Sequence, residues 1–341
     1  YHVDGLRLDA VHSILDTSAT HFLEQLATEI DALGKQLGRR LVLIAESDLN
    51  DPRVVRPAKL GGYGIGAQWS DDFHHSLHSV LTGETTGYYA DFGSWGQLCK
   101  ALRQAFVYDG CYSRFRGRRH GRSPAGLDGD HFLGYMQNHD QIGNRAKGER
   151  SSQLMSSGRL RIAAALVLTS PFVPMLFQGE EWGASTPFLY FTGHEEEELG
   201  HAVSEGRKQE FVAFGWNPDE IPDPQALDSF TRSKLDWAEL GREPHQGLLQ
   251  WHRELILLRK QNSGLTDGRL SEVQADCDEA ARWIRVTRGS VCVGCNLAND
   301  TQRIAVKPKA HARLALASDP AVRLESNQLE LPPDTAAIVI G

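Results

Sequence analysis

The stretch Gly5-Leu6-Arg7-Leu8-Asp9 alternates apolar and charged residues, and this alternation decides how the rest of the chain is interpreted. A strand directs alternate side chains to opposite faces, so the two leucines point one way while Arg7 and Asp9 point the other. If the leucines pack outward against helices, the charged pair faces the inside of a sheet or barrel. Buried charge is costly unless it is paired, and it often serves a site. The stretch alone leaves a structural ion pair and a functional site equally open.

The order strand, helix, strand recurs along the first part of the chain. Apolar residues at helical spacing run through 17–38, and apolar runs that predict strands lie on either side of them, at 5–9 and 40–45. Further strands and helices are predicted at 64–69, 71–81, 132–136, 160–168, 172–177 and 248–260. Because a helix between two strands is typical of a parallel crossover, the sequence predicts an α/β architecture with five strand-and-helix units.

Polar side chains follow these predicted strands. They are Asp9, His12, Glu46, Asp48, Gln68, Asp71, Asp72, residues 138–140 and residues 179–181. In a parallel barrel, the carboxyl ends of the strands meet at one face and build the active site. We therefore expect the functional site at this edge of the sheet.

The periodicity changes after residue 262. Short strands with turns between them are predicted at 281–287, 290–296, 303–306 and 336–340. We expect two domains, an α/β domain over 1–262 and a small all-β, sandwich-like domain over 263–341. The long irregular stretches at 83–130 and 183–237 are rich in Gly, Pro and aromatic residues, which is typical of lids or walls around a binding site.

Composition restricts the possible partners. The formal charge of -8 and a pI near 6.0 argue against nucleic-acid binding through general electrostatics. Five cysteines without the paired spacing of a secreted scaffold indicate a reducing compartment, so we expect a cytoplasmic protein. The apolar segment 162–177 is interrupted by Pro171 and Pro174 before it could span a bilayer, and we expect no membrane partner.

Two residue pairs have spacings that metal sites also use. Cys292 and Cys295 form a lone CxxC, but in a strand their side chains point to opposite faces. His74 and His78 lie four apart on a predicted helix, without the glutamate of an HExxH frame. We expect no metal site.

Three carboxylates, Asp9, Glu46 and Asp140, each lie at a strand end in polar company. Glycoside hydrolysis needs two carboxyl groups on either side of one bond, one as acid and one as nucleophile or base. Arg7 favours the ionised form of Asp9, whereas the apolar run 41–45 disfavours a charge on Glu46. This difference assigns the nucleophile to Asp9 and the acid to Glu46. The aromatic residues of the loops suit the C–H faces of sugar rings.

These residues also carry a family resemblance. Three motifs stand in order: Gly5-Leu6-Arg7-Leu8-Asp9-Ala10, Ala45-Glu46 and Asn138-His139-Asp140. Together they resemble the last three of the four short motifs of the α-amylase superfamily. The resemblance implies about strands 4–8 of a (β/α)8 TIM barrel, followed by a small all-β domain. It also implies retaining chemistry, in which Asp9 forms the glycosyl-enzyme bond, Glu46 is the acid/base and Asp140 stabilises the transition state.

Further motifs are similar to those of the maltooligosyltrehalose trehalohydrolases. They are Asn50-Asp51-Pro52-Arg53, Gln68-Trp69-Ser70-Asp71-Asp72-Phe73-His74-His75, Gln137 to Arg145, Phe177 to Gly183 and Glu205-Gly206-Arg207. His12 departs from many α-amylases, which carry Lys then His after the nucleophile. The resemblance implies a hydrolase that cuts the α-1,4 bond next to the terminal trehalose unit of maltooligosyltrehalose, releasing trehalose without a metal or organic cofactor. It implies substrate contacts at Arg7, His12, Asp71, Asp72, His74, His75, His139, Gln141 and Asn144.

Two rival functions remain open. One is another enzyme of the same superfamily, such as a glucan branching transferase, and the other is a non-catalytic glucan-binding fragment. Because the chain begins with Tyr1 at the entrance to a strand, we expect an N-terminal part of the same protein to be missing. An incomplete barrel has an open strand edge, so we expect this chain alone to be poorly stable and weakly active or inactive.

Overall fold

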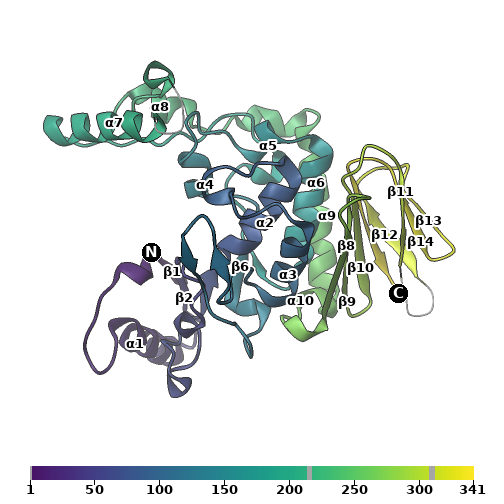
Figure 1. Ribbon diagram of the computed structural model, residues 1–341, viewed down its shortest axis with the longest axis horizontal. Helices are drawn as coiled ribbons and strands as arrows, with labels where there is room; N and C mark the ends of the chain where they lie inside the picture. Colours follow the sequence, from purple (N-terminus) through teal and green to yellow (C-terminus); the bar gives the residue numbers. More distant parts are fainter. Residues whose placement is uncertain (1, 213–216, 307–311) are drawn as a thin grey trace.

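The computed structural model describes residues 2–212, 217–306 and 312–341 and contains a five-stranded parallel sheet in which the strands follow the order of the chain (Figure 1). The strands are β1 (Gly5–Leu8), β2 (Val42–Ala45), β3 (Ala67–Trp69), β6 (Phe132–Gly134) and β7 (Val173–Pro174). All four neighbouring pairs are parallel. The predicted α/β class, with consecutive strands of a partial barrel, is confirmed.

Helices connect the strands. They are α1 (Phe22–Leu37), α2 (Asp71–Thr82), α3 (Trp95–Gln104), α4 (His139–Gly143), α5 (Ser151–Leu154), α6 (Ser157–Thr169), α7 (Glu197–Val212), α8 (Leu227–Arg232), α9 (His245–Gln261) and α10 (Ser263–Thr266). Gly83, which follows α2, has a φ of 80°, a conformation that glycine adopts without strain and that ends the helix. Between α2 and β6 lies a two-stranded ribbon, β4 (Tyr112–Ser113) and β5 (Arg118–Arg119). Helices α7 and α8 form an arm that extends away from the body (Figure 1).

Two expectations about the strands need correction. Leu6 does not pack against helices but is 52% exposed, because β1 is an edge strand of the described sheet. The strand expected over 172–177 is reduced to β7, since Pro171 and Pro174 have no N–H to donate to a neighbouring strand. Neither correction changes the alignment of the strand ends. The register pairs Leu8 with Ala45, so β1 and β2 end side by side.

The C-terminal region is entirely antiparallel. One sheet has the order β12-β15-β10-β9-β8 and the other the order β11-β14-β13. Their bounds are β8 (Val273–Asp278), β9 (Trp283–Arg288), β10 (Val291–Asn296), β11 (Gln302–Ala305), β12 (Arg313–Ala317), β13 (Arg323–Glu325), β14 (Gln328–Leu331) and β15 (Thr335–Ile340). The all-β region expected after residue 262 is confirmed, and β8, β12, β13 and β14 add to the strands expected there. Cys292 and Cys295 lie in different apolar clusters, as the alternation of a strand predicts.

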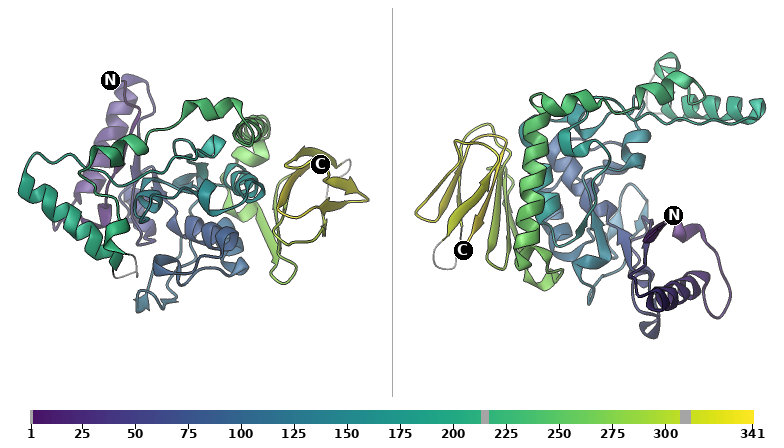
Figure 2. Two further views of the ribbon diagram at one scale, coloured as in Figure 1. Left: turned by 90° about the horizontal axis from the view of Figure 1, so that it is seen from above. Right: turned by 180° about the vertical axis from the view of Figure 1, so that it is seen from behind.

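One apolar core continues from the parallel sheet into the antiparallel region. Helix α6 is buried from Ile162 to Thr169 and contacts both β10 and β15, while α3 contacts β8. Figures 1 and 2 show α9 standing between the two kinds of sheet. The division at residue 262 therefore stays a prediction. Within the described ranges, no helix has the length and apolar character needed to cross a bilayer.

Arg288 connects the two regions through polar contacts. Its side chain is buried on β9, and its Nη1 atom donates to the carbonyl oxygens of Thr169 at 2.7 Å, Ser170 at 2.6 Å and Leu265 at 3.3 Å. Its Nη2 atom donates to the carbonyl of Asp267. Burial lowers the pKa of Arg288 to about 10, which leaves the side chain charged at neutral pH. The cation therefore satisfies the carbonyl groups at the end of α6.

Replacing Arg288 tests this junction. We expect Arg288→Ala to lower the free energy of unfolding by about 2–4 kcal/mol, because several buried carbonyl groups lose their donor. Urea denaturation followed by circular dichroism measures the change. Arg303→Ala is the matched control, since Arg303 forms an exposed pair with Glu330 at 3.0 Å on β14 and should cost less than about 1 kcal/mol. Equal losses in the two variants would contradict the assignment.

Candidate active site

The ends of β1 and β2 hold the first two carboxylates side by side. Ala10, directly after Asp9, has a φ of 41°, and this left-handed turn brings its N–H to the Oε2 atom of Glu46 at 2.6 Å. The backbone of Glu46 is fixed as well, because its N–H donates to the carbonyl of Leu8 at 2.9 Å and its carbonyl accepts from Val11 at 3.1 Å. The position of Glu46 is therefore set by three bonds to the chain around Asp9.

The guanidinium of Arg7 lies between all three predicted catalytic carboxylates. Its Nη1 atom is 2.5 Å from Oδ1 of Asp9, and its Nη2 atom is 3.8 Å from Oε2 of Glu46 and 3.9 Å from Oδ2 of Asp140. These residues come from three separate segments of the chain. The structure thus brings together the residues that the sequence placed at strand ends, and one cation offsets their mutual repulsion.

The three carboxylates differ in exposure. The side chain of Asp9 is 78% exposed and that of Asp140 is 45% exposed, whereas that of Glu46 is only 18% exposed. Glu46 is therefore the most enclosed of the three, and Asp9 is the most open to a ligand. The acid at Glu46 and the nucleophile at Asp9 stay predictions made from the sequence.

Trp69 supports the guanidinium from β3. The Cζ atom of Arg7 lies 4.6 Å from the centre of the indole ring, a cation–π contact. The ring also meets His139 edge-on at 6.0 Å and Tyr135 at 5.7 Å between centroids. One face of Trp69 is therefore covered by Arg7, which argues against its use as a platform for a sugar ring.

Asp140 lies in the first turn of α4. The side-chain oxygen of Asn138 caps this helix by accepting from Asp140 N at 2.8 Å, and Oε1 of Gln141 accepts from Asn138 N at 3.0 Å. The exposed His139 reaches back, with its Nε2 atom 3.4 Å from Oδ1 of Asp140. The predicted contact residues His139 and Gln141 are thus adjacent to the carboxylates, although the Gln141 carbonyl oxygen is used by the cap.

Asp71 is a fourth acid near the same edge of the sheet. The Tyr135 hydroxyl donates to its carboxylate. Burial raises the pKa of Asp71 to about 7, the Tyr135 bond opposes this rise, and the charges of Glu46 and Asp48 add to it. Asp71 is therefore divided between a neutral and an ionised form at physiological pH, and it can donate or accept a proton in a hydrogen bond to a ligand.

Three other predicted substrate contacts are buried in α2. Oδ2 of Asp72 accepts from Asn50 at 2.7 Å and from the backbone N–H groups of Val107 at 2.7 Å and Tyr108 at 2.8 Å. Burial raises the pKa of Asp72 to about 6, and these three bonds oppose the rise. The carboxylate therefore ties α2 to the loop after α3, and we leave Asp72 out of the proposed substrate contacts.

His74 and His75 are likewise held inside the protein. The Nδ1 atom of His74 lies 2.7 Å from the Met136 carbonyl and its Nε2 atom 2.9 Å from the Tyr89 hydroxyl, so both ring nitrogens have protein partners. His75 packs against Tyr89 and Phe92, and burial lowers its pKa to about 3. We leave both out of the proposed contacts. The sequence predicted the helix over 71–81 that contains both histidines, but it did not show that this face of the helix is buried.

The last two predicted contacts lie apart from Arg7. His12 is exposed and lines a hollow with Asp51 and Tyr63 beside β1. Oδ1 of Asn144 accepts from Nη1 of Arg207 at 3.4 Å, and Arg207 also donates to the neighbouring Gly143 carbonyl. The α7 arm is therefore fastened to the segment that follows Asp140.

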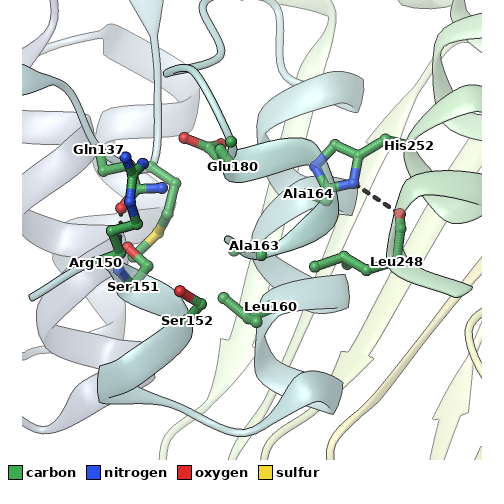
Figure 3. Close-up of a pocket in the computed structure, with 13 residues that line it drawn as sticks. Gln137, Arg150, Ser151, Ser152, Leu160, Ala163, Ala164, Glu180, Leu248 and His252 are labelled. Atoms are coloured by element: carbon green, nitrogen blue, oxygen red, sulfur yellow. Dashed lines mark hydrogen bonds between the residues drawn. The ribbon is translucent and has the colours of Figure 1, made fainter. Parts of the chain in front are cut away.

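A small buried pocket lies among α5, α6, α9 and the segments that follow β6 and β7, and Gln137, Arg150 and Glu180 are among the residues that line it (Figure 3). Arg150 is fully buried, with its Nε atom 2.7 Å from the Thr186 carbonyl and its Nη1 atom 2.7 Å from the Gln178 carbonyl. Burial raises the pKa of Glu180 to about 8, opposed by hydrogen bonds from Phe177 N and Gln137. The motif around residue 180 pointed to this carboxyl group, but no sequence signal identified Arg150, because its partners are distant backbone carbonyls.

The structure also bears on metal binding. Across residues 2–212, 217–306 and 312–341, no group of three or more His, Cys, Asp or Glu side chains is arranged to hold a metal ion. The three central carboxylates instead share Arg7, a cation that the protein itself supplies.

Comparison with known proteins agrees with this geometry. A malto-oligosyltrehalose trehalohydrolase of Rhizobium sp. (strain M-11) is 51% identical over 99% of this chain and 57% of that protein. One from Mycobacterium tuberculosis (strain CDC 1551 / Oshkosh) is 50% identical over 87% of this chain and 52% of that protein. The resemblance to maltooligosyltrehalose trehalohydrolase is confirmed. The chain spans just over half the length of these relatives.

Two further matches concern the fold. A solved structure from Salmonella typhimurium, provisionally assigned as an alpha amylase, has a TM-score of 0.86 and 33% identity over 100% of this chain and 57% of that chain. A domain of unknown function, DUF3459, matches residues 268–338, which form most of the antiparallel region. The predicted combination of α-amylase barrel strands with a C-terminal all-β region is thus confirmed.

The buried carboxyl group of Glu180 predicts a pH dependence of stability. Its pKa is raised in the folded state, so the folded protein binds more protons than the unfolded chain between about pH 4.5 and 8, and stability falls as pH rises through this window. We expect Glu180→Gln to become more stable relative to the original protein as pH rises from 5 to 8. Thermal midpoints at several pH values measure the difference.

Glu198→Gln is the control, because Glu198 is exposed on α7 and is not among the charges that act on the Glu180 carboxyl group. Its difference from the original protein should stay nearly constant over the same pH range. If Glu180→Gln gave a difference that did not change with pH, the raised pKa of Glu180 would be refuted.

Proposed function

We propose that this chain carries the catalytic groups of a retaining glycoside hydrolase that cleaves the α-1,4 bond next to the terminal trehalose unit of maltooligosyltrehalose. The observation that supports it is the meeting of Asp9, Glu46 and Asp140 around Arg7, on the motifs shared with the named relatives. Trehalose and a shorter maltooligosaccharide would be the products. The proposed reaction uses carboxyl groups alone and needs no metal or organic cofactor.

The proposed roles follow from exposure and contacts. Glu46, the most sheltered of the three, gives its proton to the glycosidic oxygen as the bond to the sugar breaks. Asp9, open to ligand, attacks the anomeric carbon and forms the glycosyl-enzyme, and Glu46 then takes a proton from the water that releases the sugar. Asp140 stabilises the positive charge of the transition state. Retention requires carboxyl groups of Asp9 and Glu46 roughly 5–5.5 Å apart in the substrate complex.

The proposed substrate contacts are the predicted residues that keep a free polar group near the carboxylates or on the adjoining surface. They are Arg7, His12, Asp71, His139, Gln141 and Asn144. Exposed aromatic residues of the segment between β7 and α9, such as Phe230, are suited to stack on sugar rings. An α-glucan is therefore the proposed partner, with neither nucleic acid nor membrane involved.

Four organisational proposals accompany the activity. The catalytic part comprises residues 1–262, and residues 263–341 form the β-domain. The protein acts in the cytoplasm. The remaining length of the relatives corresponds to barrel units that complete the sheet beside β1, whose edge is open among the described strands. Without those units, this chain would be poorly stable and weakly active or inactive.

Incubation with two different substrates distinguishes the proposed function from its rivals. A protein that combines this chain with the missing barrel units is incubated with maltooligosyltrehalose and, separately, with amylose. The proposed hydrolase releases trehalose from the first substrate. A branching transferase would instead form new branches in amylose, and a binding module would change neither substrate.

Substitution of the carboxylates tests the proposed roles. In the same complete protein, Glu46→Gln and Asp9→Asn should each lower kcat for trehalose release by about 10²–10⁴-fold, because the acid or the nucleophile is lost. Binding of maltooligosyltrehalose, followed by calorimetry, should persist. Asp31→Asn is the control, since Asp31 forms an exposed pair with Lys35 on α1. An unchanged rate of trehalose release in Glu46→Gln would remove Glu46 from the proposed catalytic groups.

Arg7 offers a second test of the same site. Arg7→Gln removes the positive charge between the three carboxylates and should lower kcat/KM by roughly 10²-fold or more, the loss seen when one stabilising group of an active site is removed. Arg7→Lys restores the charge without the planar fork and should recover only part of the rate. Steady-state assays of both variants measure this. Equal activity of all three proteins would show that Arg7 has no catalytic importance.

A further inference from the structure

Two cysteines come together where α3 packs on β8. Cys99 is buried on α3 and belongs to the main apolar cluster. Cys277 is half-buried near the end of β8, on the same face of the strand as Val273 and Ala275, which belong to that cluster too. Since α3 and β8 are in direct contact, both thiols lie in one interface between the helices of the parallel sheet and the antiparallel region.

The two thiols also interact with each other. Burial raises the pKa of the Cys99 thiol, and a hydrogen bond with Cys277 and the charge of Cys277 raise it further. An interaction of this kind requires the two sulfur atoms to be close. Cys277 is partly open to solvent while Cys99 is enclosed, so a reagent in solution reaches Cys277 first.

The other three cysteines lack this arrangement. Cys111 is exposed on the two-stranded ribbon. Cys292 and Cys295 are both buried in β10, but they contribute to different apolar clusters on opposite faces of the sheet. Among the described residues, Cys99 and Cys277 are thus the pair placed to join two regions of the fold.

We propose that Cys99 and Cys277 form a redox-sensitive pair that a small disulfide, such as glutathione disulfide, converts into a covalent link between α3 and β8. The thiolate of Cys277 attacks one sulfur of glutathione disulfide, whose S–S bond breaks and releases one glutathione. The Cys99 sulfur then attacks the Cys277 sulfur of the mixed disulfide; the Cys277–glutathione S–S bond breaks, and the Cys99 proton passes to the departing glutathione thiolate, which leaves as the second glutathione. Two protein thiols are oxidised and one glutathione disulfide is reduced to two glutathione molecules.

The link has a physical consequence for the fold. It closes a loop of well over a hundred residues, and a loop of that length strongly restricts the unfolded chain. It also fastens the antiparallel region to a helix of the parallel sheet, in addition to apolar packing and to polar contacts such as those of Arg288 and the Arg159–Asp334 pair. Oxidation is therefore expected to stabilise the protein without a change at the carboxylates around Arg7.

The test uses the protein that combines this chain with the missing barrel units, and it compares the original chain, Cys277→Ser, Cys99→Ala and Cys111→Ser in that protein, each treated with excess glutathione disulfide. Peptide mapping by mass spectrometry without reductant detects any linked pair, and thermal unfolding detects its effect. We expect a Cys99–Cys277 peptide in the original chain and in Cys111→Ser. The oxidised forms of these two should melt roughly 3–6 °C higher than their reduced forms. Neither the peptide nor the rise should occur in Cys277→Ser or Cys99→Ala.

Glutathione attached to Cys111 shows that the oxidant acted in every sample that retains this residue. If Cys111 is modified while no Cys99–Cys277 peptide forms, the proposal is overturned. A linked peptide that joins Cys277 to a different cysteine overturns it as well. Because Cys277 is half-buried and distant in sequence from the core of α3, Cys277→Ser keeps the comparison informative even if Cys99→Ala folds poorly.

Discussion

The position of the Arg7 guanidinium is the constraint on which the candidate site depends. Three carboxylates of like charge converge at the ends of strands that are adjacent or nearly so, and without a cation their ionised forms would repel one another. Arg7 can serve all three because its planar fork presents two Nη atoms toward different partners while its flat face rests on Trp69. The strand that supplies Asp9 therefore also supplies the cation that allows Glu46 and Asp140 to approach.

The layer beneath the site is held by buried polar groups bonded to backbone. Asp72 fixes the loop after α3, His74 fixes the end of β6 through Met136, and Arg150 fixes the chain around Glu180. In each case the backbone partner is close in space but distant in sequence. Each hydrogen bond therefore joins two separate segments of the chain. Such bonds are strong in a low-dielectric interior and leave few alternative arrangements. The exposed carboxylates consequently rest on segments that cannot shift independently.

The central carboxylates could be predicted from the sequence because their placement depends on two local rules. The two-residue period of a strand puts Arg7 and Asp9 on one face, and a parallel register brings the end of the next strand alongside, so Glu46 follows. The family motifs supplied Asp140. The roles of Asp72 and His74 could not be found this way, because they depend on partners such as Val107 and Met136 that only the tertiary structure supplies. The acidic residues Asp71 and Asp72 predict where α2 begins, but they do not show which of its faces is buried.

Errors in the fold have equally specific causes. The packing of the two leucines against helices was a condition of the sequence argument, and it does not hold equally for both: Leu6 is 52% exposed, whereas Leu8 packs against the main apolar cluster. The predicted strand over 172–177 shrank because proline cannot donate to a ladder. Among the extra strands, β12 pairs with the distant β15, whereas β13 and β14 are short and form a hairpin in which Glu325 pairs with Gln328.

The proposed nucleophile and the buried acids near it need opposite protonation states. Asp71, Asp72 and Glu180 have pKa values raised by burial to about 7, 6 and 8, so the fold is favoured when they are protonated. A nucleophile at Asp9 must be ionised to attack. Asp9 lies in a different environment from these acids, because its side chain is 78% exposed and lies 2.5 Å from the Arg7 guanidinium. The charge of Glu46 contributes to the raised pKa of Asp71, so the site and this buried acid are electrostatically linked.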